Sequence, residues 1–117
     1  MATASNGVKI IYGAGGISYV FLGHESADDK FHAYSKQVLD TLEKDGIRHL
    51  DTAEIYPGSE AEIGYHGGAD RFIVDTKLPG GFDEPRQKDE IIAGGKASLE
   101  RLKTKQVSIS SLIQWSC

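Results

Sequence analysis

A short stretch of the chain, His49 to Glu60, constrains its fold more than any other part of the sequence. The stretch begins as a strand and ends as the start of a helix, and its turn carries an acid, Asp51, and a phenol, Tyr56. In a parallel α/β protein such a turn lies at the carboxyl end of the strand, where active sites form. A later strand-like run over residues 72–78 brings Lys77 to the end of another strand. We therefore expect Asp51, Tyr56 and Lys77 to converge on one face as a proton-donor site.

The rest of the chain alternates strand-like and helix-like segments. Val38 and Leu42 lie four residues apart, as on one face of an amphipathic helix, and Gly46 is a natural left-handed cap at its end. Ser59 and Glu62 predict a capping box at the start of the next helix. Strand–helix repeats with short connections predict one α/β domain over residues 1–117, with a parallel sheet of βαβ units. The expected strands lie near residues 8–12, 47–51, 72–77 and 107–113, and the expected helices near residues 33–44, 59–66 and 86–103.

The amino-acid composition argues against two classes of binding partner, nucleic acid and membrane. The 117 residues are 39% hydrophobic and 26% charged, which is ordinary for a globular domain. A net charge of −4 argues against nucleic acid, because binding phosphates requires a basic surface. No apolar run approaches the ~20 residues of a membrane span, so we expect no membrane contact. The single cysteine, Cys117, permits no internal disulfide, which favours a reducing, cytoplasmic setting.

The histidines are scattered along the chain. No two of them are spaced four residues apart with a carboxylate between them, which is the pattern that helical zinc sites use. We therefore predict no metal site and expect solvated surface positions for all of them: His24, His32, His49 and His66.

Glycines follow the first expected strand, in the run Gly13 to Ser18. Such residues allow a tight turn or a close approach of the backbone to a ligand. A dinucleotide-binding fingerprint needs Gly-x-Gly-x-x-Gly opening a helix, but Ser18 replaces the third glycine and Gly23 interrupts the segment that follows. We favour a glycine-rich loop that lines a site made elsewhere. A Rossmann-like nucleotide binder using Gly13 to Gly16 stays open as an alternative.

Several segments together resemble the aldo-keto reductase family. The run Gly46 to Tyr56 resembles the family signature, and Phe72 to Leu78 resembles the strand that carries the family's lysine. Further similarity lies in Ser59-Glu60, in Ile63-Gly64 and in the helix containing Ala97 to Leu102, and the whole resemblance runs from about Val8 to Trp115. It implies the N-terminal half of a (β/α)8 TIM barrel, in a family that reduces aldehydes and ketones with NADPH. The implied partner is a small carbonyl substrate.

The resemblance also assigns roles to the residues of the site. A phenol has a reference pKa of about 10 and is therefore a weak acid at neutral pH. An ammonium group beside the phenol favours the phenolate, which lowers the pKa of the phenol and makes it a better proton donor. Tyr56 is the implied acid, Lys77 the group that tunes it, and Asp51 the carboxylate that holds Lys77 in place. The nicotinamide end of NADPH is expected to contact Gly15, Gly16, Ile17 and Asp51.

Two features depart from the family pattern. Gln114 occupies the position of the family's catalytic histidine on the fourth strand, and its amide can donate a hydrogen bond but cannot titrate. A complete barrel of this kind needs about 250 residues, and the chain ends at the fourth strand. A catalytically inactive, truncated reductase fragment acting as an interaction module is therefore the main alternative. Open sheet edges would then support self-association.

Overall fold

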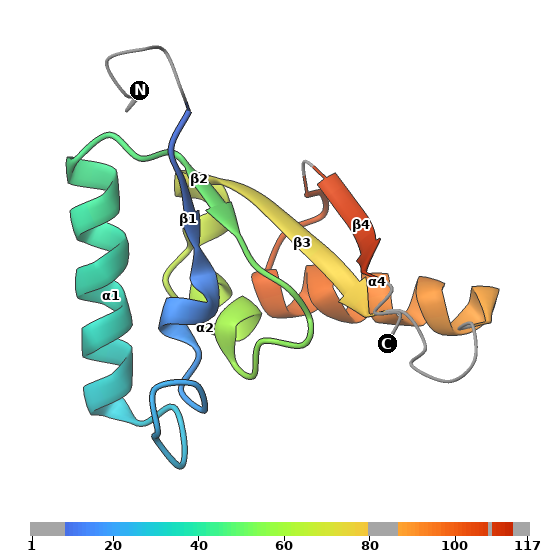
Figure 1. Cartoon of the computed structure of the whole chain (residues 1–117), viewed down its shortest axis with the longest axis horizontal. Helices are drawn as coiled ribbons and strands as arrows, with labels where there is room; N and C mark the ends of the chain where they lie inside the picture. Colours follow the sequence, from blue (N-terminus) through green and yellow to red (C-terminus); the bar gives the residue numbers. More distant parts are fainter. Residues whose placement is uncertain (1–8, 80–86, 108, 114–117) are drawn as a thin grey trace.

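The computed structural model describes residues 9–79, 87–107 and 109–113 (Figure 1). Its centre is a four-stranded, fully parallel sheet in which the strands lie side by side in chain order. Sequential order results when each strand is followed by a crossover in the same direction, as in a barrel. The predicted parallel βα architecture is therefore confirmed. The strands are β1 (Ile11–Gly13), β2 (His49–Asp51), β3 (Ile73–Pro79) and β4 (Ile109–Ile113).

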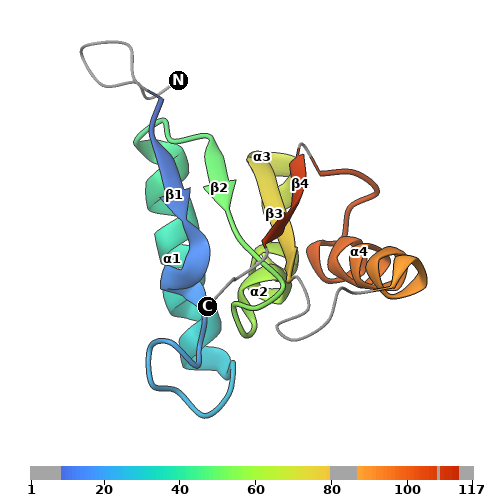
Figure 2. The same ribbon diagram turned by 45° about the vertical axis from the view of Figure 1, so that its right-hand side comes forward.

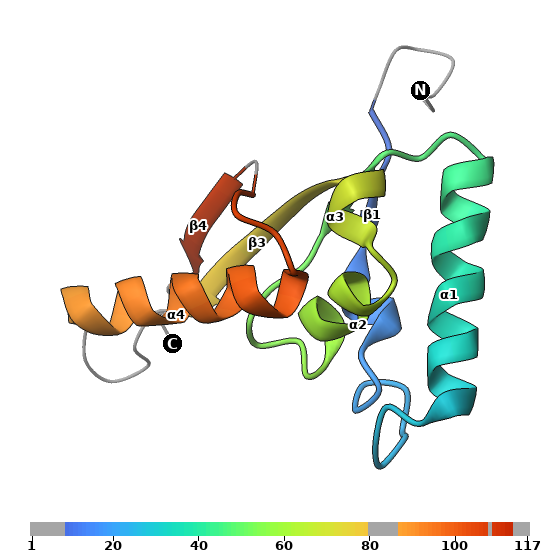
Figure 3. The ribbon, with the colours of Figure 1, turned by 180° about the vertical axis from the view of Figure 1, so that it is seen from behind.

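The helices cover one face of this sheet, as the view from behind shows (Figure 3). α1 runs beside β1 and β2, α2 and the short α3 connect β2 to β3, and α4 crosses in front of β3 and β4 in this view. The bounds of these elements are η1 (Ala14–Ile17), a single 3-10 turn, then α1 (Asp29–Lys44), α2 (Ser59–Tyr65), α3 (Gly68–Arg71) and α4 (Lys88–Leu102).

The core lies between the sheet and the helices. Side chains alternate along β3, so that Val74, Thr76 and Leu78 are buried on the helical side while Asp75 and Lys77 point to the other face. The main hydrophobic cluster joins residues of α1, α2 and α4 to the strands and to η1: Ala14, Ile17, Leu39, Leu50, Ile63, Phe72, Val74 and Leu102.

The other face of the sheet is open in the described chain (Figure 2). Ile11 and Ile73 share one register row with His49 between them, and they remain 48% and 47% exposed. In a complete barrel this face would line the interior.

Some predicted boundaries were wrong. α1 begins at Asp29 instead of near residue 33, because the side chain of Asp28 accepts a hydrogen bond from the Phe31 amide at 2.9 Å and caps the helix. The first strand covers 11–13 instead of 8–12. The predictions also missed η1 and α3. The remaining elements are within two residues of their expected ends, namely 49–51, 73–79 and 109–113 for the strands and 59–65 and 88–102 for the helices.

The start of α2 does not use the predicted capping box. The N-cap residue is Gly58, at φ 80°, and no side chain caps the helix. The Ser59 hydroxyl instead donates to the Ala14 carbonyl at 2.7 Å, and Glu62 turns toward α1. The predicted left-handed residue after α1 is confirmed, since Gly46 has φ 81°.

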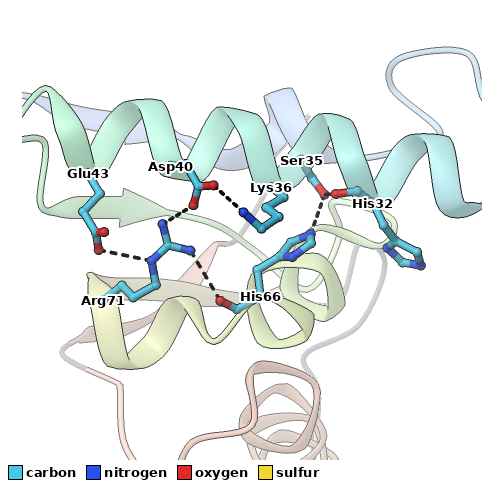
Figure 4. Close-up of polar contacts among 7 residues, drawn as sticks. All are labelled: His32, Ser35, Lys36, Asp40, Glu43, His66 and Arg71. Carbon is cyan, nitrogen blue, oxygen red and sulfur yellow. Dashed lines mark hydrogen bonds and ion pairs between the residues drawn. The ribbon is translucent and has the colours of Figure 1, made fainter.

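Arg71 links α3 to the C-terminal half of α1 (Figure 4). Its guanidinium donates to Asp40 Oδ1 at 2.6 Å and to Glu43 Oε2 at 3.1 Å. Hydrogen bonds from Lys36 and Arg71 hold the pKa of the Asp40 carboxyl below its ordinary value of 3.8. Asp40 therefore stays ionised and keeps both cations in place.

Two helical glycines should respond oppositely to alanine. A Cβ on Gly64 of α2 would collide with the backbone carbonyl of Arg101 in α4, whereas a Cβ on Gly95 would meet only Leu78 Cδ1 at 4.0 Å. We expect Gly64→Ala to lower the free energy of unfolding by about 2–3 kcal/mol through overpacking. Gly95→Ala, the matched control, should raise it by about 1 kcal/mol through helix propensity. Urea denaturation followed by circular dichroism measures both, and equal effects would contradict the close α2–α4 approach.

Candidate active site

The candidate site lies where β2 and β3 end. Asp51 pairs with Asp75 in the β2–β3 register, so Asp51 and Lys77 project from the same open face. The Lys77 ammonium forms an ion pair with Asp51 Oδ1 and donates to the carbonyl of Thr52 at 3.0 Å. Lys77 is 18% exposed and Asp51 37% exposed, so the pair is partly shielded but open to a ligand.

Tyr56 lies beside this pair, in the turn between β2 and α2. The Lys77 nitrogen is 5.9 Å from the centroid of the Tyr56 ring. The Phe21 ring packs edge-on against the Tyr56 ring, with a centroid distance of 5.7 Å. The structure thus brings together Asp51, Tyr56 and Lys77, the three residues expected to converge.

A second polar pair, a histidine beside a carboxylate, lies two residues earlier along each strand on the same face. His49 Nε2 is 2.8 Å from Asp75 Oδ2, and the two side chains are only 8% and 16% exposed. The predicted surface position of His49 was therefore wrong. Strand alternation places His49 on the same face as Asp51, and Asp75 on the same face as Lys77. Matching His49 with Asp75 also requires the β2–β3 register. This contact lies on the same face of the sheet as the Asp51–Lys77 ion pair.

The glycine-rich run forms the neighbouring wall. Gly15 and Gly16 are half-buried in η1, and the Tyr34 hydroxyl donates to the Gly16 carbonyl at 3.3 Å. Burial, aided by Tyr34, raises the pKa of the Tyr12 hydroxyl, which therefore stays protonated beside Gly16. The Ile17 side chain is fully buried in the core, so any contact of Ile17 with a cofactor would come from its backbone.

The segment after β1 differs from the one that binds dinucleotides in a doubly wound fold. Four residues of 3-10 helix follow β1, and the long helix α1 begins only at Asp29. A doubly wound sheet would also place β1 between later strands, whereas β1 here lies at one end of a sequential sheet. The Rossmann-like alternative therefore lacks both of its structural requirements.

Two further predicted residues, Gln114 and His66, are not among those that the structure places in this site. Gln114 lies outside the described residues. His66 was expected at the surface, but its side chain is only 8% exposed and lies close to Glu62, between α1 and α2.

The fold and the site together define a class of protein. Parallel βα units in sequential order form part of an α/β barrel, with ionisable side chains gathered at the carboxyl ends of its strands. The Aldo/keto reductase family model matches residues 9–116, so the chain belongs to that family of oxidoreductases. The resemblance expected from residues 46–56 and 72–78 is confirmed.

Known relatives agree with this assignment. A thermostable aldo-keto reductase, Tm1743, solved with the inhibitor epalrestat, superposes with a TM-score of 0.69 at 26% identity, over 92% of this chain and 38% of that one. A Pseudomonas aeruginosa protein described as an aldo-keto reductase shares the fold, with a TM-score of 0.62 at 20% identity over 87% of this chain and 39% of its own. Oxidoreductase sirO of Leptosphaeria maculans is 35% identical over 74 residues, which are 62% of this chain and 22% of sirO.

The chain therefore spans well under half the length of these relatives. In the described part of the chain, no helix combines the length and the apolar character needed to cross a membrane.

Proposed function

We propose that this chain carries the proton-donor half of an NADPH-dependent reductase that converts an aldehyde or ketone to an alcohol. The observation that carries the proposal is the position of Lys77, which Asp51 and the Thr52 carbonyl hold beside the Tyr56 ring. An ion pair of purely structural character would not require a phenol next to its cation.

The chain's own residues would act on the carbonyl oxygen. Reduction of a carbonyl builds negative charge on that oxygen, which must receive a proton. The Tyr56 hydroxyl donates this proton, because the Lys77 ammonium stabilises the phenolate that remains. Asp51 keeps Lys77 oriented toward the site. NADPH, when bound, supplies the hydride.

The described residues suit one end of this cofactor. A Cβ on Gly16 would collide with the Tyr12 hydroxyl, whereas a Cβ on Gly15 would make an ordinary contact with the Phe21 ring at 3.6 Å. Without side chains, both residues leave their backbone open to a ligand. Gly15, Gly16, the Ile17 backbone and Asp51 would hold the nicotinamide end. The family's remaining cofactor contacts belong to later strands, which implies that they come from another part of the protein or from another chain.

The open face favours a second candidate function, an interaction module. Ile11 and Ile73 present apolar side chains that are about half exposed on the face that a barrel would enclose. Within the described residues, β1 and β4 each pair with one strand only. A second copy joined through these edges would cover that surface without any need for cofactor.

Titration of the purified chain with NADPH, followed by cofactor fluorescence, separates the two functions. We expect saturable binding in the micromolar range, with Gly15→Val weakening it by about tenfold or more, equivalent to about 1.4 kcal/mol. Gly95→Ala in α4, remote from the site, is the matched control and should leave the affinity unchanged. The oligomeric state is measured on the same sample by analytical ultracentrifugation.

The result of the NADPH titration decides between the reductase and the interaction module. Saturable binding that depends on Gly15 supports the reductase, and a dimer would indicate that a second copy completes the site. Absence of binding at millimolar NADPH contradicts the reductase proposal for this chain, and dimerisation in that case supports the interaction module.

A further inference from the structure

Four polar side chains gather between α1 and α2, on the helical side of the sheet. Figure 4 shows three of them, His32, Ser35 and His66. α1 contributes His32 and Ser35, and α2 contributes Glu62, with His66 directly after its last residue. The spacings are i, i+3 on α1 and i, i+4 on α2, so each helix presents its two residues on one face. This group, called here the α1–α2 cluster, has no part in the proposed reduction.

The α1–α2 cluster converges on one atom, Oε1 of Glu62. His32 Nδ1 lies 2.7 Å from it, Ser35 Oγ 2.5 Å and His66 Nε2 3.4 Å. Ser35 Oγ also lies 2.9 Å from His66 Nε2. The ligand atoms of His32, Glu62 and His66 all fall within 4.8 Å of one another.

Two of these separations can be compared directly with those around a metal ion with short bonds. Tetrahedral zinc, with bonds of about 2.0–2.1 Å, places its ligand atoms roughly 3.3 Å apart. The Glu62–His66 separation already has this value. The His32–Glu62 separation would need to widen by about half an ångström on binding, a small rotation of a side chain that is 22% exposed.

Charge balance points in the same direction. Glu62 is 2% exposed, and a buried carboxylate is costly unless a positive charge compensates it. Glu60, two residues earlier and equally buried, has Arg101 as its partner. Among the described residues, the contacts of the Glu62 carboxylate come from His32, Ser35 and His66, with no lysine or arginine. A divalent cation would supply a compensating charge, as would a proton on one of the two histidines.

The ligand types select the metal. Two imidazoles and one carboxylate form a known zinc ligand set, and imidazole suits zinc far better than magnesium or calcium. Tyr65 stacks on the His32 ring at a centroid distance of 4.0 Å, which orients that ligand. Tyr65 is 57% exposed, so an entry path for the ion lies at this side of the α1–α2 cluster.

We propose that His32, Glu62 and His66 bind a zinc ion that joins α1 to α2, through His32 Nδ1, Glu62 Oε1 and His66 Nε2. Ser35 lies beside the fourth position, where its hydroxyl would hold a water ligand. The site is structural for the helix pair and independent of the carbonyl-reducing site.

Titration of the metal-free full chain with Co²⁺, followed by visible absorption, tests the site, since cobalt reports low-coordinate nitrogen and oxygen ligation in the position of zinc. The experiment uses a tag-free Cys117→Ser background so that no terminal thiol takes part. We expect saturable binding, displacement by Zn²⁺, and a Tm higher by at least about 5 °C with zinc in 100-fold excess over its Kd.

Two variants and one control locate the metal. His66→Gln and His32→Gln should each weaken Co²⁺ binding by about tenfold or more. His32→Gln is the safer test of folding because that side chain is partly exposed. His24→Gln, an exposed histidine in the loop before α1, should bind like the parent. Absence of binding at millimolar Co²⁺ and Zn²⁺, or binding that His32→Gln leaves unchanged, overturns the proposal.

Discussion

Replacing Glu60 by alanine should lower the free energy of unfolding by about 2–4 kcal/mol, because it removes a buried carboxylate that pairs with the partly exposed Arg101 and leaves buried hydroxyls without an acceptor. Glu60 is 2% exposed and joins three elements. Its Oε1 accepts from Arg101 Nε at 2.9 Å and from Ser98 Oγ at 3.2 Å, and its Oε2 accepts from Thr76 Oγ1 at 2.6 Å. Truncation would leave the buried hydroxyls of Thr76 and Ser98 without their acceptor and remove the link from α2 to α4.

Urea denaturation of matched variants measures this effect. Glu60→Gln keeps the size and one acceptor oxygen but loses the charge, so a smaller loss of about 1–3 kcal/mol is expected. Glu100→Ala changes an exposed carboxylate on α4 beside Arg101 and should stay within about 0.5 kcal/mol of the parent. A Glu60→Ala variant as stable as Glu100→Ala would show that the buried carboxylate contributes nothing net.

The parts of the fold that sequence predicts well are those set by local periodicity. Leu50 and Val74 lie within the strand-like runs that the sequence predicts, and both are buried in the core. Asp51 and Lys77 follow from the same pattern, because residues that end parallel strands meet at one edge. The convergence of the candidate site therefore follows from the pattern of strands and helices along the chain.

Interactions between distant elements are much harder to predict. Glu62 fits a capping box by its spacing from Ser59, and an acidic first turn suits the helix dipole as well. Neither interpretation reveals that His32 and Ser35 approach from another helix, since that depends on how α1 crosses α2. Tertiary contacts then override the local cap, and Gly58 takes the N-cap position.

His49 shows a second limit of local reasoning. A lone histidine near a strand is usually solvated, and only the neighbouring strand supplies the carboxylate of Asp75 that allows its burial. The required observation is the β2–β3 register, which places His49 opposite Ile73 and Asp51 opposite Asp75. Register is a property of the pair of strands, so one strand alone could not predict the His49–Asp75 contact.

The other large expected effect concerns Tyr56. In a chain that binds NADPH, Tyr56→Phe should lower kcat for aldehyde reduction by about 10²–10⁴-fold, because removal of a positioned proton donor costs that much. The phenyl ring keeps its contacts with Phe21 and with the Lys77 ammonium, so the fold and the Kd for NADPH should not change. Steady-state oxidation of NADPH with an aromatic aldehyde measures kcat and KM separately.

The control for this change is Tyr19→Phe, which removes a hydroxyl from a ring packed against Phe31 and Gly58. It should retain the parent kcat. A Tyr56→Phe variant with parent kcat would mean that the proton comes from another group. Lys77 would then serve only as a structural partner of Asp51. A loss of kcat with unchanged KM would instead locate the phenol's effect in the transition state, where a proton donor acts and a merely packing tyrosine does not.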